Sequence, residues 1–347
     1  MQPSPSDPEV LPYEPPQVVV VRPPRRPLWL HALLFLLTCV TTLIVGARLQ
    51  QQFTAVQPMF LADPDFFHWR DVMDHPGKVL DGLPFAASLL AILFAHEMGH
   101  FLLAVRNRVY ATLPFFLPAP TPIGTFGAFI QIRSRFHSRS ELLDIAIGGP
   151  IAGFVVAVPL AVVGLVMSRP HAPENSVMGL GMPPIFDLLQ QLIHMAGVAQ
   201  SAPMHLMLLH PIALAAWVGM LATALNLLPG GQLDGGHIVF ALSPRAHRYA
   251  SVIGAAGLLV AAYYLWSGWM IWAIAFLLTR KHPTVARPEP TLASSRKTCA
   301  WLGLLLFVLT LMPVPFDSGS FKSAIDDWRE SRRVERVMQQ YQQLHQR

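Results

Sequence analysis

A chain of 347 residues that is 53% hydrophobic and only 13% charged, with its apolar residues in long blocks, is not an ordinary water-soluble protein. This composition predicts an all-α polytopic membrane protein in contact with a lipid bilayer. The formal net charge of +5 does not indicate a nucleic-acid partner, because Lys and Arg gather in the loops that flank the apolar blocks. Cys39 and Cys299 lie in separate blocks, which excludes a disulfide framework.

The first third of the chain holds a polar tail and two apolar blocks. Residues 1–28 contain nine prolines among polar residues and predict a disordered tail, because such a composition cannot pack a core. Leu28–Ala47 follows three arginines, is too long for a cleaved signal, and predicts a retained signal anchor. Leu83–Val105 predicts a second span, since a helix of 23 residues reaches about 34 Å.

The helical period disappears between Ala111 and Ile132, where four prolines and Gly124 break any helix. From residue 125 onward, apolar side chains occupy alternate positions, which is a strand pattern. An open strand cannot face lipid, so we expect a membrane-associated β-strand or hairpin near 112–132 that lies against the helices or lines a wet cavity. An ordinary surface hairpin is the alternative.

Five further spans are predicted: Leu142–Met167, Pro211–Leu228, two from Ala250–Thr279, and Thr298–Val314. Ala250–Thr279 is divided because it is too long for one crossing and has a break at Ser267–Gly268. About seven spans result, with most Lys and Arg on one side of the membrane. We expect a membrane domain at 29–315 with its core at 82–279, and a charged helical tail at 316–347.

The second span carries His96-Glu97-Met98-Gly99-His100, where a membrane helix should hold only hydrocarbon. Residues four apart share a helical face, so both imidazoles can bind one metal ion with Glu97 beside them. The alternative is a helix with two hydrogen-bonded core histidines. Ten residues separate His96 from Arg106, which places the motif about 15 Å below the basic face and therefore nearer the cytoplasmic side.

Two more polar motifs are expected at the same side of the membrane. The third span begins with Gly148-Gly149-Pro150-Ile151-Ala152-Gly153, whose small residues let another helix approach closely. The fourth span ends in the segment 226–237, whose proline and four glycines cannot continue a regular helix. A broken helix at this depth would present Asp234 inward, so Asp234 is the predicted third metal ligand.

Two histidines and one carboxylate leave the fourth position of zinc open for water, as hydrolytic zinc sites require. Zn²⁺ is therefore the expected cofactor. Glu97 is the candidate general base, which would take a proton from the attacking water and pass it to the leaving amine. Asn226 is a candidate hydrogen-bond donor to the developing oxyanion, and capping of the broken helix is an equal alternative for it.

The three motifs together resemble the signatures of the site-2 protease family of intramembrane zinc metalloproteases, in the form HEMGH, GGPIAG and NLLPGGQLDG. The wider sequence is similar to the plastid and bacterial branch named for ethylene-dependent gravitropism-deficient and yellow-green mutants. The similar segments are GLPFAASLLAILFAHEMGHFLLAV and PFFLPAPTPIGTFGAFIQIRS. The resemblance covers roughly Gly82 to Thr279. It implies that His96, His100 and Asp234 bind zinc and that the 112–132 segment lies next to the substrate.

The resemblance also implies an endopeptidase that cuts transmembrane segments of other membrane proteins, in regulated intramembrane proteolysis. About 35 residues separate the second and third spans, too few for the inserted peptide-binding domain of better-known bacterial members. Substrate selection would then fall to the spans, loops and tails. The strand at 125–132, which includes Gly127, could pair with a locally unwound substrate and hold it at the zinc.

Two other functions fit parts of the pattern. A metal transporter could use the same three ligands as a transit site, although neither internal duplication nor an exit path is evident in the sequence. A non-catalytic membrane scaffold would bind no zinc. The N-terminal residues are not a Ser/Arg-rich transit peptide, so we expect a multi-pass protein of a bacterial plasma membrane.

Overall fold

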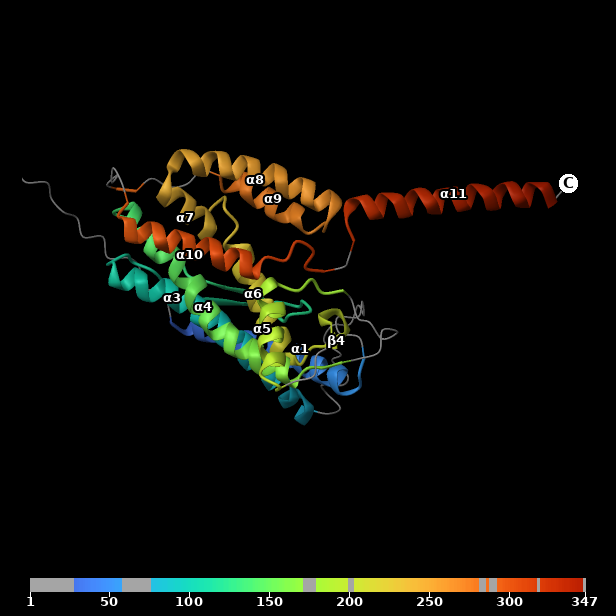
Figure 1. Ribbon diagram of the computed structural model, residues 1–347, viewed down its shortest axis with the longest axis horizontal. Coiled ribbons are helices and arrows are strands. Elements are labelled where there is room, and N and C mark those ends of the chain that lie inside the picture. The colour runs from blue at the N-terminus through green and yellow to red at the C-terminus, as the bar shows by residue number, and fades with distance from the viewer. Residues whose placement is uncertain are drawn as a thin grey trace, which may run out of the picture.

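The computed structural model describes residues 28–57, 76–170, 179–198, 203–280, 285–286, 292–316 and 319–345. The predicted tail at 1–28 lies outside these residues except for Leu28, which begins the first helix. The described chain is mainly helical (Figure 1). Three of its helical segments are long and apolar enough to cross a membrane: α1 (Leu28–Thr54), the segment Pro76–Arg106 that ends in α3, and α4 (Arg139–Met167).

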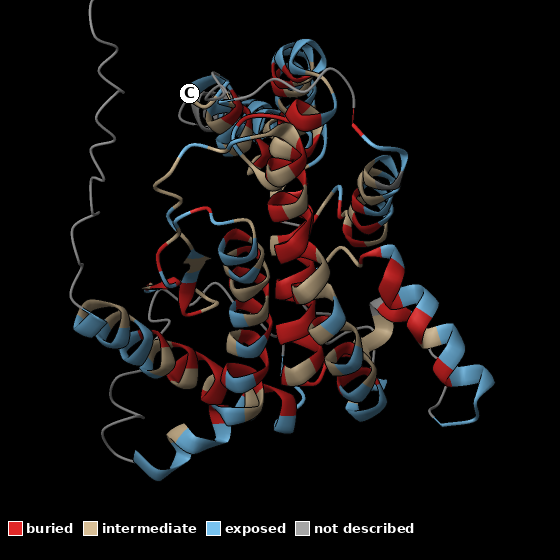
Figure 2. Ribbon diagram, turned by 90° about the vertical axis from the view of Figure 1, so that its left-hand side faces the viewer, coloured by how far each residue is buried: buried red, intermediate tan, exposed pale blue. Residues whose placement is uncertain are grey.

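The helix α6 (Pro211–Asn226) lies at the centre of the bundle. It is apolar on all sides, and its residues from Ala213 to Trp217 are completely enclosed. A helix without a polar face is stable only when other helices or lipid surround it, and here α3 and α4 pack against it. Figure 2 shows the same distribution, with buried residues in the middle of the molecule and exposed residues on the outer helices.

The helices α3 (Leu83–Arg106) and α4 pack against each other more extensively than any other pair. Their backbones meet at Gly99 and Gly148, where a Cβ on Gly99 would overlap the Gly148 carbonyl oxygen. Small residues at this crossing allow the approach, as the third-span motif predicted. The close contact fixes the height and rotation of α3 relative to α4.

Two short antiparallel strands, β1 (Phe115–Pro118) and β2 (Thr125–Phe129), follow α3. The hairpin is held against α1, because the Thr41 hydroxyl donates to the Gly124 carbonyl over 2.6 Å and the His31 ring lies 3.9 Å from the Phe115 ring. In the described residues β2 has β1 as its only strand partner, so the outer edge of β2 is unpaired. The strand β2 also contacts α3.

The broken segment after α6 contains a helix that the sequence did not predict. α6 ends at Asn226, residues 227–233 form a turn, and α7 (Asp234–Leu242) starts at the aspartate itself. Glycines normally disfavour a helix, but Gly235 and Gly236 have no room for a Cβ, which would overlap the carbonyl oxygens of Leu227 and Gly231. Close backbone packing therefore requires glycine at both positions, although the sequence pattern predicted that these glycines would break the helix.

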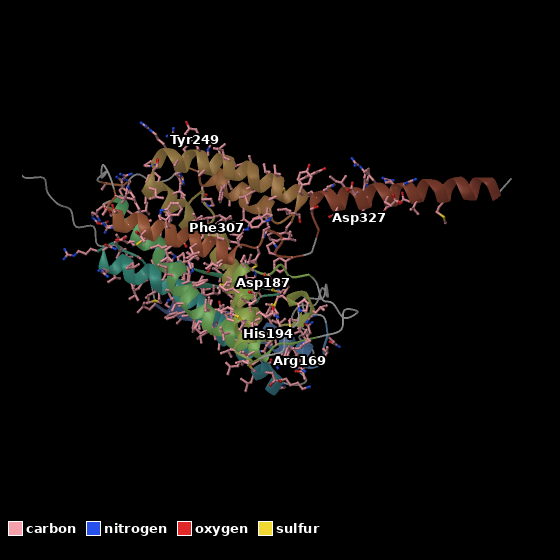
Figure 3. The ribbon with its side chains drawn as sticks, viewed as in Figure 1. Arg169, Asp187, His194, Tyr249, Phe307 and Asp327 are labelled. Carbon is pink, nitrogen blue, oxygen red and sulfur yellow. The ribbon has the colours of Figure 1, made fainter. Side chains whose placement is uncertain are left out.

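The remaining helices surround this centre. They are α5 (Pro184–Met195), α8 (Pro244–Tyr264), α9 (Trp269–Leu278), α10 (Ser294–Thr310) and α11 (Phe321–His345). The predicted break at Ser267–Gly268 lies between α8 and α9, which run side by side, and α11 extends away from the bundle (Figure 1). Figure 3 shows Arg169 and His194 at one end of the molecule and Tyr249 of α8 at the other.

Candidate metal centre

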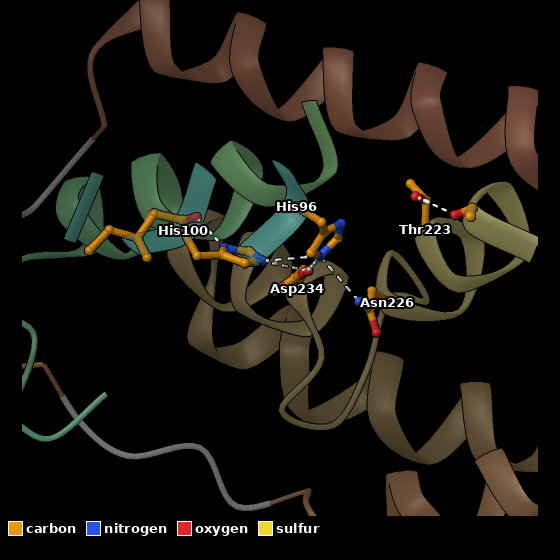
Figure 4. A network of polar contacts seen from close by, with 7 residues as sticks. His96, His100, Thr223, Asn226 and Asp234 are labelled. Carbon is orange, nitrogen blue, oxygen red and sulfur yellow. Dashed lines mark hydrogen bonds and ion pairs between the residues drawn. The ribbon is translucent and has the colours of Figure 1, made fainter. Parts of the chain in front are cut away.

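The two histidines of the second-span motif lie on one face of α3, one turn apart. Both are buried, and their Nε2 atoms are 3.2 Å apart (Figure 4). Asp234, at the start of α7, completes the group, because its Oδ2 atom lies 3.4 Å from His96 Nε2 and 3.2 Å from His100 Nε2. The fold thus brings together residues that are more than 130 positions apart in the sequence.

These three atoms fit a zinc ion. The corners of a tetrahedron with metal bonds of about 2.0–2.1 Å are about 3.3 Å apart, which is the spacing that the nitrogens and the oxygen show. Asp234 Oδ2 is buried and has no hydrogen-bond donor in the part of the chain that the structure describes. A buried carboxylate oxygen without a donor is unfavourable unless a cation satisfies it, and a zinc ion at this point would do so.

A backbone carbonyl orients one of the histidines. His100 Nδ1 lies 2.8 Å from the carbonyl oxygen of Ile145 in α4, so Nδ1 carries the proton and Nε2 keeps its lone pair for a metal. Gly149 makes the space for this ring, since a Cβ there would overlap the imidazole. The sequence predicted only a helix-packing role for Gly149. The GGPIAG motif is therefore also the wall of the metal site.

Glu97 lies next to the histidines and is 6% exposed. The backbone amide of Ile130, just beyond β2, interacts with its carboxylate. Gly127 is placed differently from Ile130: its φ of +95° bends the strand, and its N–H donates to Thr125 Oγ1 over 2.9 Å. In the described chain the strand therefore reaches Glu97 through Ile130, and Gly127 shapes the strand.

Asn226 is the last residue of α6, and its side-chain amide reaches the metal site. Its Nδ2 atom lies 3.3 Å from His96 Nε2, as Figure 4 shows. One turn earlier, the Thr223 hydroxyl donates to the Gly219 carbonyl of the same helix, and α6 remains helical through Asn226. The end of α6 thus presents an amide beside the ligand atoms.

Two histidines from an HExxH helix and an aspartate from a second helix, enclosed by apolar helices, form a candidate metal centre with the ligand types of a zinc metalloprotease. The comparison with protein families agrees, because the model of peptidase family M50 matches residues 84–263. The matched range covers about half of the chain and contains all three ligands, and the chain belongs to this family.

Relatives with curated names are plant proteins. The chain is 33% identical over 307 residues to "Probable zinc metalloprotease EGY1, chloroplastic" of Arabidopsis thaliana, an alignment that covers 85% of this chain and 55% of the relative. It is 37% identical over 169 residues to the protein of the same name in Oryza sativa subsp. japonica, covering 46% and 28%. It is 30% identical over 251 residues to "Probable zinc metalloprotease EGY2, chloroplastic" of Arabidopsis thaliana, covering 68% and 42%.

These matches confirm the predicted resemblance to site-2 proteases and to their ethylene-dependent gravitropism-deficient and yellow-green branch. The relatives' names also support zinc as the metal, in agreement with the two-histidine and one-carboxylate group. The chain spans 55% of the length of the first of these relatives, and 28% and 42% of the other two.

The prediction of a bacterial plasma membrane is contradicted. The relatives named as EGY zinc metalloproteases are plant proteins named as chloroplastic, which points to a chloroplast membrane instead. That prediction rested on N-terminal residues that do not resemble a Ser/Arg-rich transit peptide, and this composition alone does not identify the membrane that a chain occupies.

Proposed function

We propose that this chain is an intramembrane zinc endopeptidase that hydrolyses peptide bonds in or near transmembrane segments of other proteins. The observation that carries the proposal is the group of His96, His100 and Asp234, with ligand atoms 3.2–3.4 Å apart and a buried glutamate beside them. Membership of family M50 supports the same activity.

The roles of the side chains follow from their positions. Zinc, when bound, acts as a Lewis acid toward a peptide carbonyl and a water molecule. Glu97 takes a proton from the attacking water and gives it to the leaving amine. The Asn226 amide, 3.3 Å from a ligand nitrogen, donates a hydrogen bond to the oxygen on which negative charge develops. The enclosing helices exclude bulk water and strengthen both interactions.

The outer edge of β2 is the proposed binding place for substrate. The Gln131 carbonyl accepts a hydrogen bond from the Thr112 N–H over 3.0 Å, so the backbone groups of Gln131 face the β1 side. Neighbouring strand residues direct these groups to opposite edges, and Ile130 therefore faces outward, where it meets Glu97. An unwound substrate segment that added a strand to this edge would lie along the catalytic glutamate.

We propose seven membrane crossings, by α1, α3, α4, α6, α8, α9 and α10, with the hairpin held among them. The long helices α1, α3 and α4 and the apolar helix α6 support this arrangement. α9 has ten residues and covers about 15 Å, so the chain beyond Leu278 would complete its crossing. Between α3 and α4 the described residues form the hairpin, and we propose that the helices and loops select membrane-protein substrates without an inserted peptide-binding domain.

The proposed activity is tested with Glu97→Gln in the full chain reconstituted into vesicles with a model single-span substrate. We expect the variant to retain zinc by elemental analysis and to lose roughly 10²–10⁴-fold in cleavage rate, because the general base is removed while the ligands stay. Glu141→Gln is the matched control, since Glu141 lies in the first turn of α4 outside the site, and it should cut normally. Undiminished cleavage by Glu97→Gln contradicts the proposal, and wild-type protein without zinc favours a scaffold.

The strand proposal is tested with Ala128→Pro, which removes an N–H from the outer edge of β2. Loss of one backbone hydrogen bond to substrate predicts a fall in kcat/KM of up to roughly tenfold with zinc retained. Ala128→Ser keeps the N–H and serves as the control. Equal kcat/KM values for the two variants would remove the outer edge of β2 from the binding site.

A further inference from the structure

The turn that connects α6 to α7 brings Asp234 to the metal site, although few of its own backbone groups bond within it. It consists of residues 227–233, and Gly231 at its centre has a left-handed φ of +61°. Such a turn has no helical ladder or sheet to fix it. Its position must be set by whatever contacts it from outside.

Side chains from α8 and α9 make these contacts. His247 Nε2 lies 2.8 Å from the Gly231 carbonyl oxygen, and the Gly231 N–H donates to Ser251 Oγ over 3.1 Å. His247 and Ser251 are one turn apart on the same face of α8, and they are 2% and 0% exposed. Just after α9, Thr279 Oγ1 accepts from the Gln232 N–H over 3.3 Å. Both backbone groups of Gly231 are thus bound by buried side chains of one helix.

The bound turn supports the start of α7 directly. The Gly231 carbonyl oxygen, which His247 holds, also lies against Gly236, where a Cβ would overlap it. The ring of Phe240, further along α7, meets the His247 ring edge to face with centroids 5.6 Å apart. His247 therefore contacts both the turn before Asp234 and the helix after it.

We propose that His247, together with Ser251, is a positioning residue for the zinc site, which fixes the Gly231 turn and thereby the place of Asp234. This inference rests on the proposed zinc site. Removing the hydrogen bonds lets the turn shift and moves Asp234 away from His96 and His100, while the histidines keep their places on α3. The loss should appear first in zinc affinity, because the aspartate supplies one of three ligands.

The test measures zinc affinity of the purified full chain in nanodiscs by competition with a chromophoric chelator. His247→Leu keeps an apolar volume without the donor, and we expect it to bind zinc about 10–100-fold more weakly, as is typical when an outer-shell partner of a metal ligand is lost. His247→Gln places an amide N–H near the Nε2 position, and its affinity should stay within about threefold of the wild type. Wild-type affinity in His247→Leu overturns the proposal. Equal weakening in both variants also overturns it, because then packing and not the hydrogen bond would matter.

Two further variants keep the test decisive. Ser251→Ala removes the second hydrogen bond with little change in volume and should weaken zinc binding several-fold; if His247→Leu does not fold, wild-type affinity in Ser251→Ala overturns the proposal. His210→Leu is the matched control, because His210 is also buried and caps α6 through a 3.3 Å bond from the Ile212 N–H. His210 contacts Ser168, next to Arg169, at the end of the molecule opposite Tyr249 of α8 (Figure 3). The His210→Leu substitution should lower the free energy of unfolding and leave zinc affinity unchanged.

The outcome is separable from that of the proposed function. A wild-type chain that binds zinc but cuts no membrane substrate would refute the peptidase activity, while the chelator competition would still decide the role of His247. A wild-type chain that cuts substrate while His247→Leu keeps full zinc affinity would refute the positioning role alone.

Discussion

The two halves of the metal site are held in different ways. The histidine half is formed by α3 and α4, whose backbones touch at Gly99 and Gly148 and whose positions are fixed along their whole length. The aspartate half is a turn and a helix of nine residues: α7 packs against α4, and the turn is bonded by side chains of α8 and by Thr279, just after α9. Close packing between two long helices leaves little room to adjust, whereas a turn bonded by side chains can shift by small steps.

This difference predicts how each half responds to damage. A change in the histidine half should remove the metal outright, because either helix could move away only by losing the extensive packing between α3 and α4. A change in the aspartate half should weaken zinc binding by degrees, because the turn can shift while its other hydrogen bonds hold. Three substitutions, in decreasing order of expected effect, test this contrast.

Gly149→Ala should have the largest effect. Its Cβ would overlap the His100 ring, and moving α4 away to relieve the overlap would break the close packing at Gly99 and Gly148. The imidazole must then turn away from its bond to the Ile145 carbonyl, and we expect zinc affinity to fall by more than roughly a hundredfold. Gly153→Ala is the control on the same helix, since its Cβ would lie 3.2 Å from His96 Cβ and needs only a small adjustment. Similar affinities in the two variants would show that the histidine half is not rigid.

Gly235→Ala should have an intermediate effect. The added Cβ would overlap the carbonyl oxygen of Leu227, and it would press the turn away from α7. Because the turn is held by side chains, it can shift, and we expect a loss of about tenfold in zinc affinity with the histidines still in place. Chelator competition measures it. A complete loss of zinc, equal to that of Gly149→Ala, would erase the distinction between the halves.

Arg296→Ala should have the smallest effect. Arg296 at the start of α10 makes a two-point ion pair with Asp144 of α4, at 3.0 and 3.2 Å, beside the carbonyl that orients His100. The two side chains are 38% and 26% exposed, so solvent screens the pair. We expect the free energy of unfolding to fall by about 1 kcal/mol or less, with zinc affinity unchanged. A large loss of zinc would mean that the ion pair, and not backbone packing, positions the histidine half.

The histidine half could be read from the sequence. The spacing in HEMGH predicts its geometry, because residues four apart on a helix share a face. The apolar residues around the motif predict the helix itself. The long spans were recognised for the same reason, and α3 and α4 differ from their predicted bounds by three residues or fewer at each end. Local rules suffice where the helix itself sets the geometry.

The aspartate half was only partly visible. The sequence indicated that a helix breaks after Asn226 and that Asp234 faces inward, but it did not predict that α7 begins at Asp234. Helix propensity alone marks Gly235 and Gly236 as helix breakers. The packed turn requires glycine at both positions, because a Cβ would overlap its backbone. His247 and Ser251 belong to none of the three sequence motifs, although their side chains bind the turn.

By itself, then, the sequence determined the membrane class, the helix that carries both histidines and Glu97, and Asp234 as the candidate third ligand. Only the tertiary structure decided that Gly149 shapes the ligand pocket, that Ile145 orients His100, that Ile130 brings the strand to Glu97, and that α8 holds the turn of Asp234. The reason is physical. A helix fixes the relation between residues three or four positions apart, but contacts between distant segments depend on how whole helices pack, and no local pattern encodes that packing.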